Sequence, residues 1–216
     1  MSRLTWTLAA AAVGILTSTV FSALLQWPRA AFVAVHSVIV LALVAAYLRV
    51  ERVGLVRQVQ RRWQAGLIVG AFIGALIVRS VLAQPGSPAP QGAALAGALA
   101  WFGVVYGTVD ALLLSVIPVL TLYGTISADT LKVPGARLRW GVVALLGSAL
   151  VTAAYHWGFV EFRGPQVMQP IIGNTLITLA YLLSGNPLAP VVAHVVMHVA
   201  SVLHGMQTTV QLPPHY

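Results

Sequence analysis

Long apolar runs, separated by short polar or charged segments, dominate the chain. A membrane-spanning helix needs about 20 predominantly apolar residues. Seven stretches meet that requirement: 5–26, 29–50, 66–84, 92–126, 139–160, 168–184 and 187–206. The pattern predicts an all-α polytopic transmembrane helical bundle of about seven helices, in which residues 1–216 form a single integral membrane domain. The first run follows Arg3 but is long for a signal sequence and offers no clean cleavage site, so we expect an uncleaved helix.

The fourth run, 92–126, is longer than a single crossing requires. At 1.5 Å per residue it measures about 50 Å as a helix, which exceeds the apolar thickness of a bilayer. We therefore expect this span to tilt strongly, to protrude, to kink at Pro118, or to be partly re-entrant.

Charge in the connecting segments tests the number of crossings. Loop 84–92 carries no charge, whereas loop 127–139, expected to be interfacial, holds Lys132, Arg137 and Arg139. Loop 49–65 is more basic still, with Arg49, Arg52, Arg57, Arg61 and Arg62. Basic loops stay on the cytoplasmic side of a membrane. Seven crossings with a cytoplasmic N-terminus and an outside C-terminus place both basic loops inside and the neutral loop outside.

Composition agrees with a membrane protein and limits its chemistry. The chain is 59% hydrophobic and 7% charged, with a mean hydropathy of +0.89, which excludes an ordinary soluble domain. The net charge of +8 is dispersed among apolar spans, so we expect a lipid bilayer as partner and no nucleic acid. Cysteine is absent, so a metal would need histidine, carboxylate or water as ligands. The usage of Ala, Val, Arg and Gly suits a bacterial plasma membrane, which would be the inner membrane.

Asp110 is the one acidic residue in the middle of an apolar span, "VVYGTVDALLLSVIPVL". Ionisable side chains at membrane depth are costly and by default mark a functional site. Asp110 is therefore a candidate catalytic base or metal ligand. The alternative is a structural carboxylate that is paired with a cation or protonated by its surroundings.

His194 and His198 lie four residues apart in the last span, so they share one helical face. Two imidazoles at this spacing can bind one metal ion. The alternative is a pair of histidines that form hydrogen bonds between helices.

The remaining histidines carry weaker signals. His156, beside Tyr155 near an outer helix end, alone fits an interfacial aromatic belt. His36, inside the second span, is a packing histidine or a fourth ligand. His204 and His215 are expected to be interfacial or incidental.

Asp110, His156, His194 and His198 together form a possible catalytic constellation. Three neutral imidazoles and a water are the open arrangement of a catalytic zinc site, and a nearby carboxylate can take a proton from that water. The reaction class is metal-assisted hydrolysis with a divalent metal, zinc by preference. His156 lies about 25 Å along its span from the inner end and His194 about 10 Å, at 1.5 Å per residue. Tilt or a kink must close that gap.

Residues 171–205, "IIGNTLITLAYLLSGNPLAPVVAHVVMHVASVLHG", resemble the last conserved region of the CPBP intramembrane proteases. That family includes CAAX prenyl endopeptidases and bacteriocin-processing or abortive-infection proteins. Its His-x-x-x-Asn motif corresponds to His194 and His198, and its Phe-x-x-x-His motif to Thr152 and His156. Its Glu-Glu-x-x-x-Arg motif corresponds to the stretch that begins at Asp110. The resemblance covers a CPBP-like core over residues 100–206.

The resemblance implies an intramembrane metalloendopeptidase. Asp110 would activate water, His156, His194 and His198 would bind the metal, and the substrate would be a membrane-associated peptide or protein. Ala111 and Ser115 replace the second glutamate and the arginine of the first motif. A divergent member, or an inactive one that acts in partner binding, regulation or bacteriocin immunity, both remain open.

A second resemblance and a third class of function are weaker. The hemolysin III and progestin/adiponectin receptor group also ends in a helix with His-x-x-x-His, and His36 with Asp110 would complete its zinc set. The sequence before His194 is more similar to the CPBP family. A transporter needs polar groups in matching halves of the chain, and the first three spans carry few.

Overall fold

The structure, a computed structural model, describes residues 3–214, so the expectation for His215 lies outside the described residues. Seven helices are long and apolar enough to cross a membrane within this part of the chain: Leu4–Leu24, Arg29–Val50, Trp63–Leu82, Gly92–Leu122, Ala136–Trp157, Gly164–Ser184 and Leu188–Gly205. The predicted all-α polytopic bundle is confirmed, and each predicted span overlaps one of these helices.

Several spans are built from more than one helical segment. The first span joins α1 (Arg3–Thr17) to the π-helical η1 (Ser18–Leu24), and is followed by α2 (Arg29–Val50), the short α3 (Leu55–Gln60) and α4 (Trp63–Leu82). The long span joins α5 (Gly92–Ala98), η2 (Leu99–Val105), α6 (Tyr106–Ala111), η3 (Leu112–Val116) and α7 (Ile117–Leu122). The remaining elements are α8 (Ala128–Lys132), α9 (Ala136–Trp157), η4 (Val160–Phe162), η5 (Gly164–Val167), α10 (Met168–Ser184) and α11 (Leu188–Gly205).

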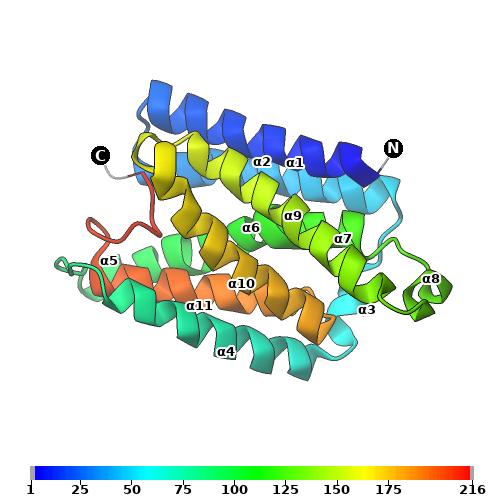
Figure 1. The fold of residues 1–216 in the computed structure, drawn as a ribbon. Coiled ribbons are helices and arrows are strands. Elements are labelled where there is room, and N and C mark those ends of the chain that lie inside the picture. Colours follow the sequence, from blue (N-terminus) through cyan, green and yellow to red (C-terminus); the bar gives the residue numbers. More distant parts are fainter. Residues whose placement is uncertain (1–2, 215–216) are drawn as a thin grey trace.

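The connections alternate between the two ends of the bundle (Figure 1). Segments 51–62 and 123–135, which contain α3 and α8, lie at the end where the described chain begins. Segments 83–91 and 206–214 lie at the opposite end. Both basic loops therefore share one end, because two spans, α4 and the long span, separate them along the chain. The loop expected at 127–139 contains the one-turn helix α8, because the Ser127 hydroxyl accepts a hydrogen bond from the Thr130 amide and caps it.

The long span crosses the bundle once, as expected, and it deviates from a regular helix in two π-helical stretches, η2 and η3. Pro118 is the second residue of α7, the segment that follows η3. Proline has no N–H to give to the carbonyl one turn earlier, and in a membrane that carbonyl needs another donor. The Leu114 carbonyl accepts hydrogen bonds from Ser148 (2.6 Å) and from Asn174 (3.3 Å) instead. The irregular helix is thus tied to α9 and α10.

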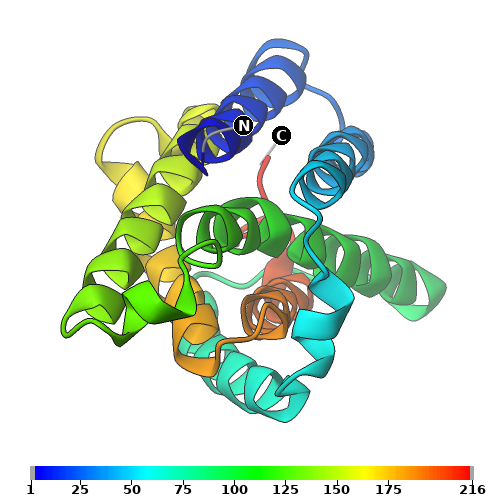
Figure 2. The same cartoon turned by 90° about the vertical axis from the view of Figure 1, so that its right-hand side faces the viewer.

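Helix α11 lies inside the bundle, with α4, α10 and the long span around it (Figure 2). Two helices approach it closely through glycine. A Cβ at Gly70 of α4 would meet the Ala189 carbonyl oxygen, and one at Gly107 of α6 would lie 3.0 Å from the Val195 Cα. Such close approaches bury the middle of α11, where the two paired histidines lie.

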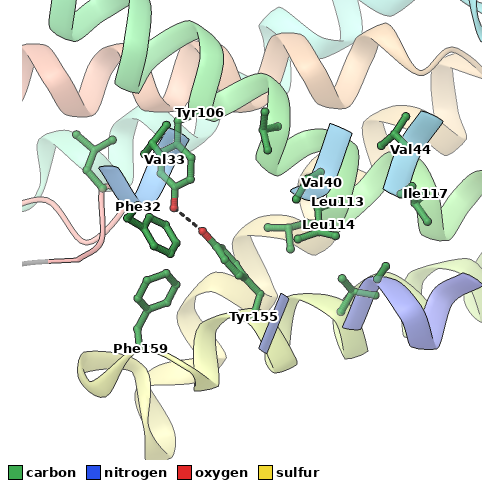
Figure 3. Close-up of a cluster of buried hydrophobic side chains, with 14 of the residues drawn as sticks. Phe32, Val33, Val40, Val44, Tyr106, Leu113, Leu114, Ile117, Tyr155 and Phe159 are labelled. Atoms are coloured by element: carbon green, nitrogen blue, oxygen red, sulfur yellow. Dashed lines mark hydrogen bonds between the residues drawn. The ribbon is translucent and has the colours of Figure 1, made fainter. Parts of the chain in front are cut away.

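An apolar cluster packs the long span against α2 and α9 (Figure 3). Its labelled members include Phe32 and Val33 of α2, Leu113 of η3, and Phe159 just after α9. One polar contact runs through this cluster, the 2.7 Å hydrogen bond between the Tyr106 and Tyr155 hydroxyls that Figure 3 draws as a dashed line. This cluster forms the side of the bundle next to Asp110.

Candidate metal centre

The turn before α11 fixes where its histidines lie. Gly185 ends α10 in the left-handed region, with φ of 66°, a conformation that costs glycine little. Asn186 then accepts a hydrogen bond from the Leu188 amide (2.8 Å) and donates to the carbonyls of Val59 (2.9 Å) and Arg61 (2.8 Å). The start of α11 is therefore anchored to the end of α3 and to the residue that follows it.

Asp110, His194 and His198 come together in the bundle. Their candidate ligand atoms all lie within 4.8 Å of one another, and each of the three residues is at most 4% exposed. The two imidazole rings stack with centroids 5.9 Å apart and planes 18° apart. His198 Nε2 lies 3.4 Å from Asp110 Oδ2. The structure thus places the two histidines on one face of α11 and brings Asp110 beside them.

Several polar atoms in this group have no hydrogen-bond partner among residues 3–214. They are the Nδ1 atom of His194, both ring nitrogens of His198, and Oδ1 of Asp110. Buried polar atoms are usually hydrogen-bonded, because leaving them unpaired costs free energy. Two imidazoles and a carboxylate are also a donor set that catalytic zinc uses, with a further position left for water. The residues therefore fit a divalent metal ion.

A hydrogen-bond network around Asn174 holds the Nε2 side of the His194 ring. The Asn174 amide nitrogen donates to Thr152 (2.6 Å) and Ser148 (2.9 Å), so its Oδ1 is the atom that faces Nε2 of His194 at 3.1 Å. An amide oxygen only accepts, so Nε2 of His194 carries the hydrogen. The lone pair then lies on Nδ1, the atom without a partner. A histidine that binds a metal through one ring nitrogen typically donates a hydrogen bond from the other, as His194 does to Asn174.

Sequence reasoning missed Asn174, although an amide in the apolar run "IIGNTLITLAYLL" was an available signal. Ser115, which stands where the CPBP motif has arginine, belongs to the same network. Its hydroxyl donates to Asn174 Oδ1 at 2.9 Å and lies 2.8 Å from the Thr178 hydroxyl.

His156 lies on the wall of the same cavity but outside the group of three. Its Nδ1 is 2.9 Å from the Thr152 carbonyl, which can only accept, so Nδ1 carries the hydrogen and Nε2 the lone pair. Its ring packs edge-on against Phe162, with centroids 5.0 Å apart. The structure therefore brings this histidine to the cavity without placing it among the closely gathered ligand atoms.

The other predicted polar residues divide between site and surface. His36 lies beside Asp110, with Nε2 3.6 Å from Oδ1, although it is not part of the group of three. His204 is 2.8 Å from the Gln84 carbonyl, near the end of α11.

A cavity of about 500 Å³ joins these side chains. Asp110, His156, His194 and His198 face it. Its walls are otherwise mainly apolar and come from several helices and from the C-terminal segment: Leu76, Ile77, Leu114, Phe162, Ile172, Leu176, Ile177, Met197, Val210 and Pro213 are among the lining residues. Asp110 and the three histidines thus lie at the side of a mainly apolar cavity.

A comparison with protein families identifies the last part of this arrangement. Residues 130–200 match the family model for the type II CAAX prenyl endopeptidase Rce1-like proteins. This match supports the predicted similarity of the chain to the CPBP family. It spans about a third of the chain, and includes His156, Asn174, His194 and His198 but not Asp110. Searches of curated proteins and of solved structures gave no match. The CPBP-like histidines thus lie in the matched region, whereas the carboxylate that joins them comes from the preceding span.

Proposed function

We propose that the protein is an intramembrane metal-dependent endopeptidase that hydrolyses a peptide bond in a membrane-associated peptide or protein. The observation that carries this proposal is the buried group of Asp110, His194 and His198 on the wall of a largely apolar cavity. The match of residues 130–200 to CAAX prenyl endopeptidases supports proteolysis over other hydrolytic reactions.

His194 would bind the metal, zinc in this proposal, through Nδ1, and His198 through a ring nitrogen. His156 would approach with Nε2, the atom that its hydrogen bond to the Thr152 carbonyl leaves free. A bound divalent ion activates water and polarises the carbonyl of the scissile bond.

Asp110 would act as general base and then as general acid. Its carboxylate takes a proton from the attacking water and passes it to the leaving amine. Its contact with His198 at 3.4 Å places it beside the proposed ligands. The apolar cavity walls bind the chain around the scissile bond and keep bulk water away.

The experiment that tests this function measures metal content by mass spectrometry in gently detergent-purified protein. The wild type should hold near one zinc ion per chain, and the His194→Ala/His198→Ala double variant should hold none. His204→Ala is the matched control, because His204 lies on the same helix but contacts the Gln84 carbonyl. A folded wild type without metal contradicts the proposal. It would leave the histidines as helix-to-helix contacts in an inactive relative.

The orientation in a bacterial inner membrane belongs to the same proposal, with the N-terminus cytoplasmic and the C-terminus outside. The chain has no cysteine, so single cysteines can be labelled without background. Gln60 and Gln91 are exposed at opposite ends of the bundle. In intact spheroplasts, a membrane-impermeant maleimide should label Gln91→Cys and not Gln60→Cys. The reverse pattern would invert the topology.

A further inference from the structure

We propose that Thr17 and His36, from the first two spans, position the Asp110 carboxylate for its work. Both residues lie outside the region that matches the family model, and neither belongs to the group of three candidate ligands. The catalytic consequence rests on the proposed function. The hydrogen-bond arrangement itself does not.

Two aromatic rings hold the His36 ring in place. His36 is fully buried, and its ring stacks on Phe32, one helical turn earlier, at 5.5 Å and 12°. Tyr155 of α9 stacks with it at 5.0 Å and 24°. Phe32 and Tyr155 both appear in Figure 3, from different helices. The stacked faces leave only the ring edges for polar contacts, and those edges hold the two nitrogens.

The two edges point to different partners. Nε2 faces Asp110 Oδ1 at 3.6 Å, and Nδ1 faces the Thr17 hydroxyl at 3.1 Å. An ionised carboxylate only accepts, so Nε2 must carry the hydrogen for this contact to be favourable. In a neutral imidazole Nδ1 is then the acceptor, and the Thr17 hydroxyl is placed to donate to it. The chain of donors therefore runs from Thr17 to His36 to Asp110.

This series of hydrogen bonds forms only if the Thr17 hydroxyl donates to His36. The hydroxyl has one hydrogen, and the carbonyls of Val13 and Gly14 compete for it at 2.8 and 3.1 Å. If the hydrogen goes to either carbonyl, His36 Nδ1 must donate to the Thr17 oxygen instead. A neutral His36 would then present a lone pair to the Asp110 carboxylate. The proposal therefore requires the Nε2–H tautomer of His36.

Holding Oδ1 has a consequence for the other carboxylate oxygen. Oδ1 has no hydrogen-bond partner among the described residues, and Oδ2 faces His198. A contact of 3.6 Å is longer than a formed hydrogen bond, and such contacts often tighten when a substrate binds. His36 thereby holds Oδ1 of Asp110 in place, so that Oδ2 faces the proposed metal ligands.

Two substitutions at His36 separate this role from simple packing. His36→Gln keeps an N–H donor at the reach of Nε2 but loses the ring, and His36→Phe keeps the stacked ring but loses the donor. We expect the affinity for Zn²⁺, measured by chelator competition, to fall about tenfold in His36→Phe and less than threefold in His36→Gln, because a carboxylate that is no longer held by His36 cannot keep His198 oriented toward the metal. Thermal unfolding should rank the two variants the other way round. Equal or tighter Zn²⁺ binding by His36→Phe than by His36→Gln overturns the proposal.

The tautomer can be read directly. In detergent-solubilised protein with ¹⁵N-labelled histidine, the His36 signals, assigned by their loss in His36→Gln, should show the Nε2–H form. Thr17→Val should shift them toward the Nδ1–H form, and Thr17→Ser should restore the original pattern. An Nδ1–H wild type, or a tautomer that does not respond to Thr17→Val, overturns the proposal. Because this measurement needs no metal and no substrate, it separates failure of this inference from failure of the proposed enzyme activity.

Discussion

Two polar clusters lie next to each other inside the bundle. In one of them every side-chain polar atom is hydrogen-bonded, whereas in the other several have no partner in the described part of the chain. The amide cluster consists of Ser115, Ser148, Thr152, Asn174 and Thr178. Each of these side chains takes part in hydrogen bonds of 2.6–3.3 Å that link the long span, α9 and α10. None of its side-chain polar atoms is without a partner.

The acid cluster, Asp110 with His36, His194 and His198, is equally buried but poorly satisfied. Its carboxylate contacts are 3.4 and 3.6 Å long, and four ring nitrogens in it have no hydrogen-bond partner in residues 3–214. A saturated network specifies how helices pack. An unsaturated one costs stability, which a metal or a substrate can offset.

His194 connects the two clusters. Its Nε2 belongs to the amide cluster through Asn174, and its Nδ1 faces the acid cluster without a partner. Substitutions in the two clusters should therefore have different effects: the amide cluster links helices, whereas the acid cluster carries the chemistry in the proposed function.

Asp110→Asn should produce the largest change on the chemical side. The amide cannot accept the proton of water, so hydrolysis should fall by about 10²- to 10⁴-fold. Thermal stability should hold or rise, because a buried charge is removed. Hydrolysis of quenched fluorescent peptides in proteoliposomes gives the first quantity, and thermal unfolding in detergent the second. Retained activity in a well-folded Asp110→Asn protein would remove Asp110 from the role of base.

Asn174→Leu should show the converse signature. Asn174 has five partners within hydrogen-bond distance, but its amide nitrogen has two hydrogens for three acceptors, so four bonds form at once. Bonds between membrane helices are worth roughly 0.6 kcal/mol each. We expect a loss of about 2 kcal/mol in unfolding free energy, to be measured by denaturant titration in mixed micelles. Thr175→Val is the matched control, because the Thr175 hydroxyl bonds only within α10, to the Ile171 carbonyl. An Asn174→Leu protein as stable as this control would show that the amide cluster does not hold the helices together.

The sequence predicts the spans and the paired histidines of α11, but not the contacts between helices. Spans follow from local hydropathy, and the shared face of His194 and His198 follows from the helical period, so both were predictable. The contacts of Asn174 and His36 could not be predicted in this way. Their partners lie on other helices, so their contacts depend on how α10 and α2 are rotated about their axes. Helix α2 is apolar on every side, which leaves its orientation unmarked in the sequence. For Asn174, Pro118 gave an indirect signal, since the carbonyl freed at Leu114 had to find a donor.

The smallest expected effect concerns His156, which lies between the two clusters. Its Nδ1 is bound to the carbonyl of Thr152, a member of the amide cluster, while the ring faces the cavity shared with the acid cluster. Because it stands outside the closely gathered ligand atoms, it must move toward them to complete a metal site.

We therefore expect His156→Gln to weaken Zn²⁺ binding by up to tenfold, well below the loss in the His194→Ala/His198→Ala variant, with little change in thermal stability. Chelator competition on both variants gives the ranking. Zn²⁺ binding unchanged by His156→Gln would limit the proposed imidazole ligands to His194 and His198 of α11. His156 would then be a cavity histidine whose lone pair faces the substrate, and the third imidazole inferred from the sequence would not be a ligand.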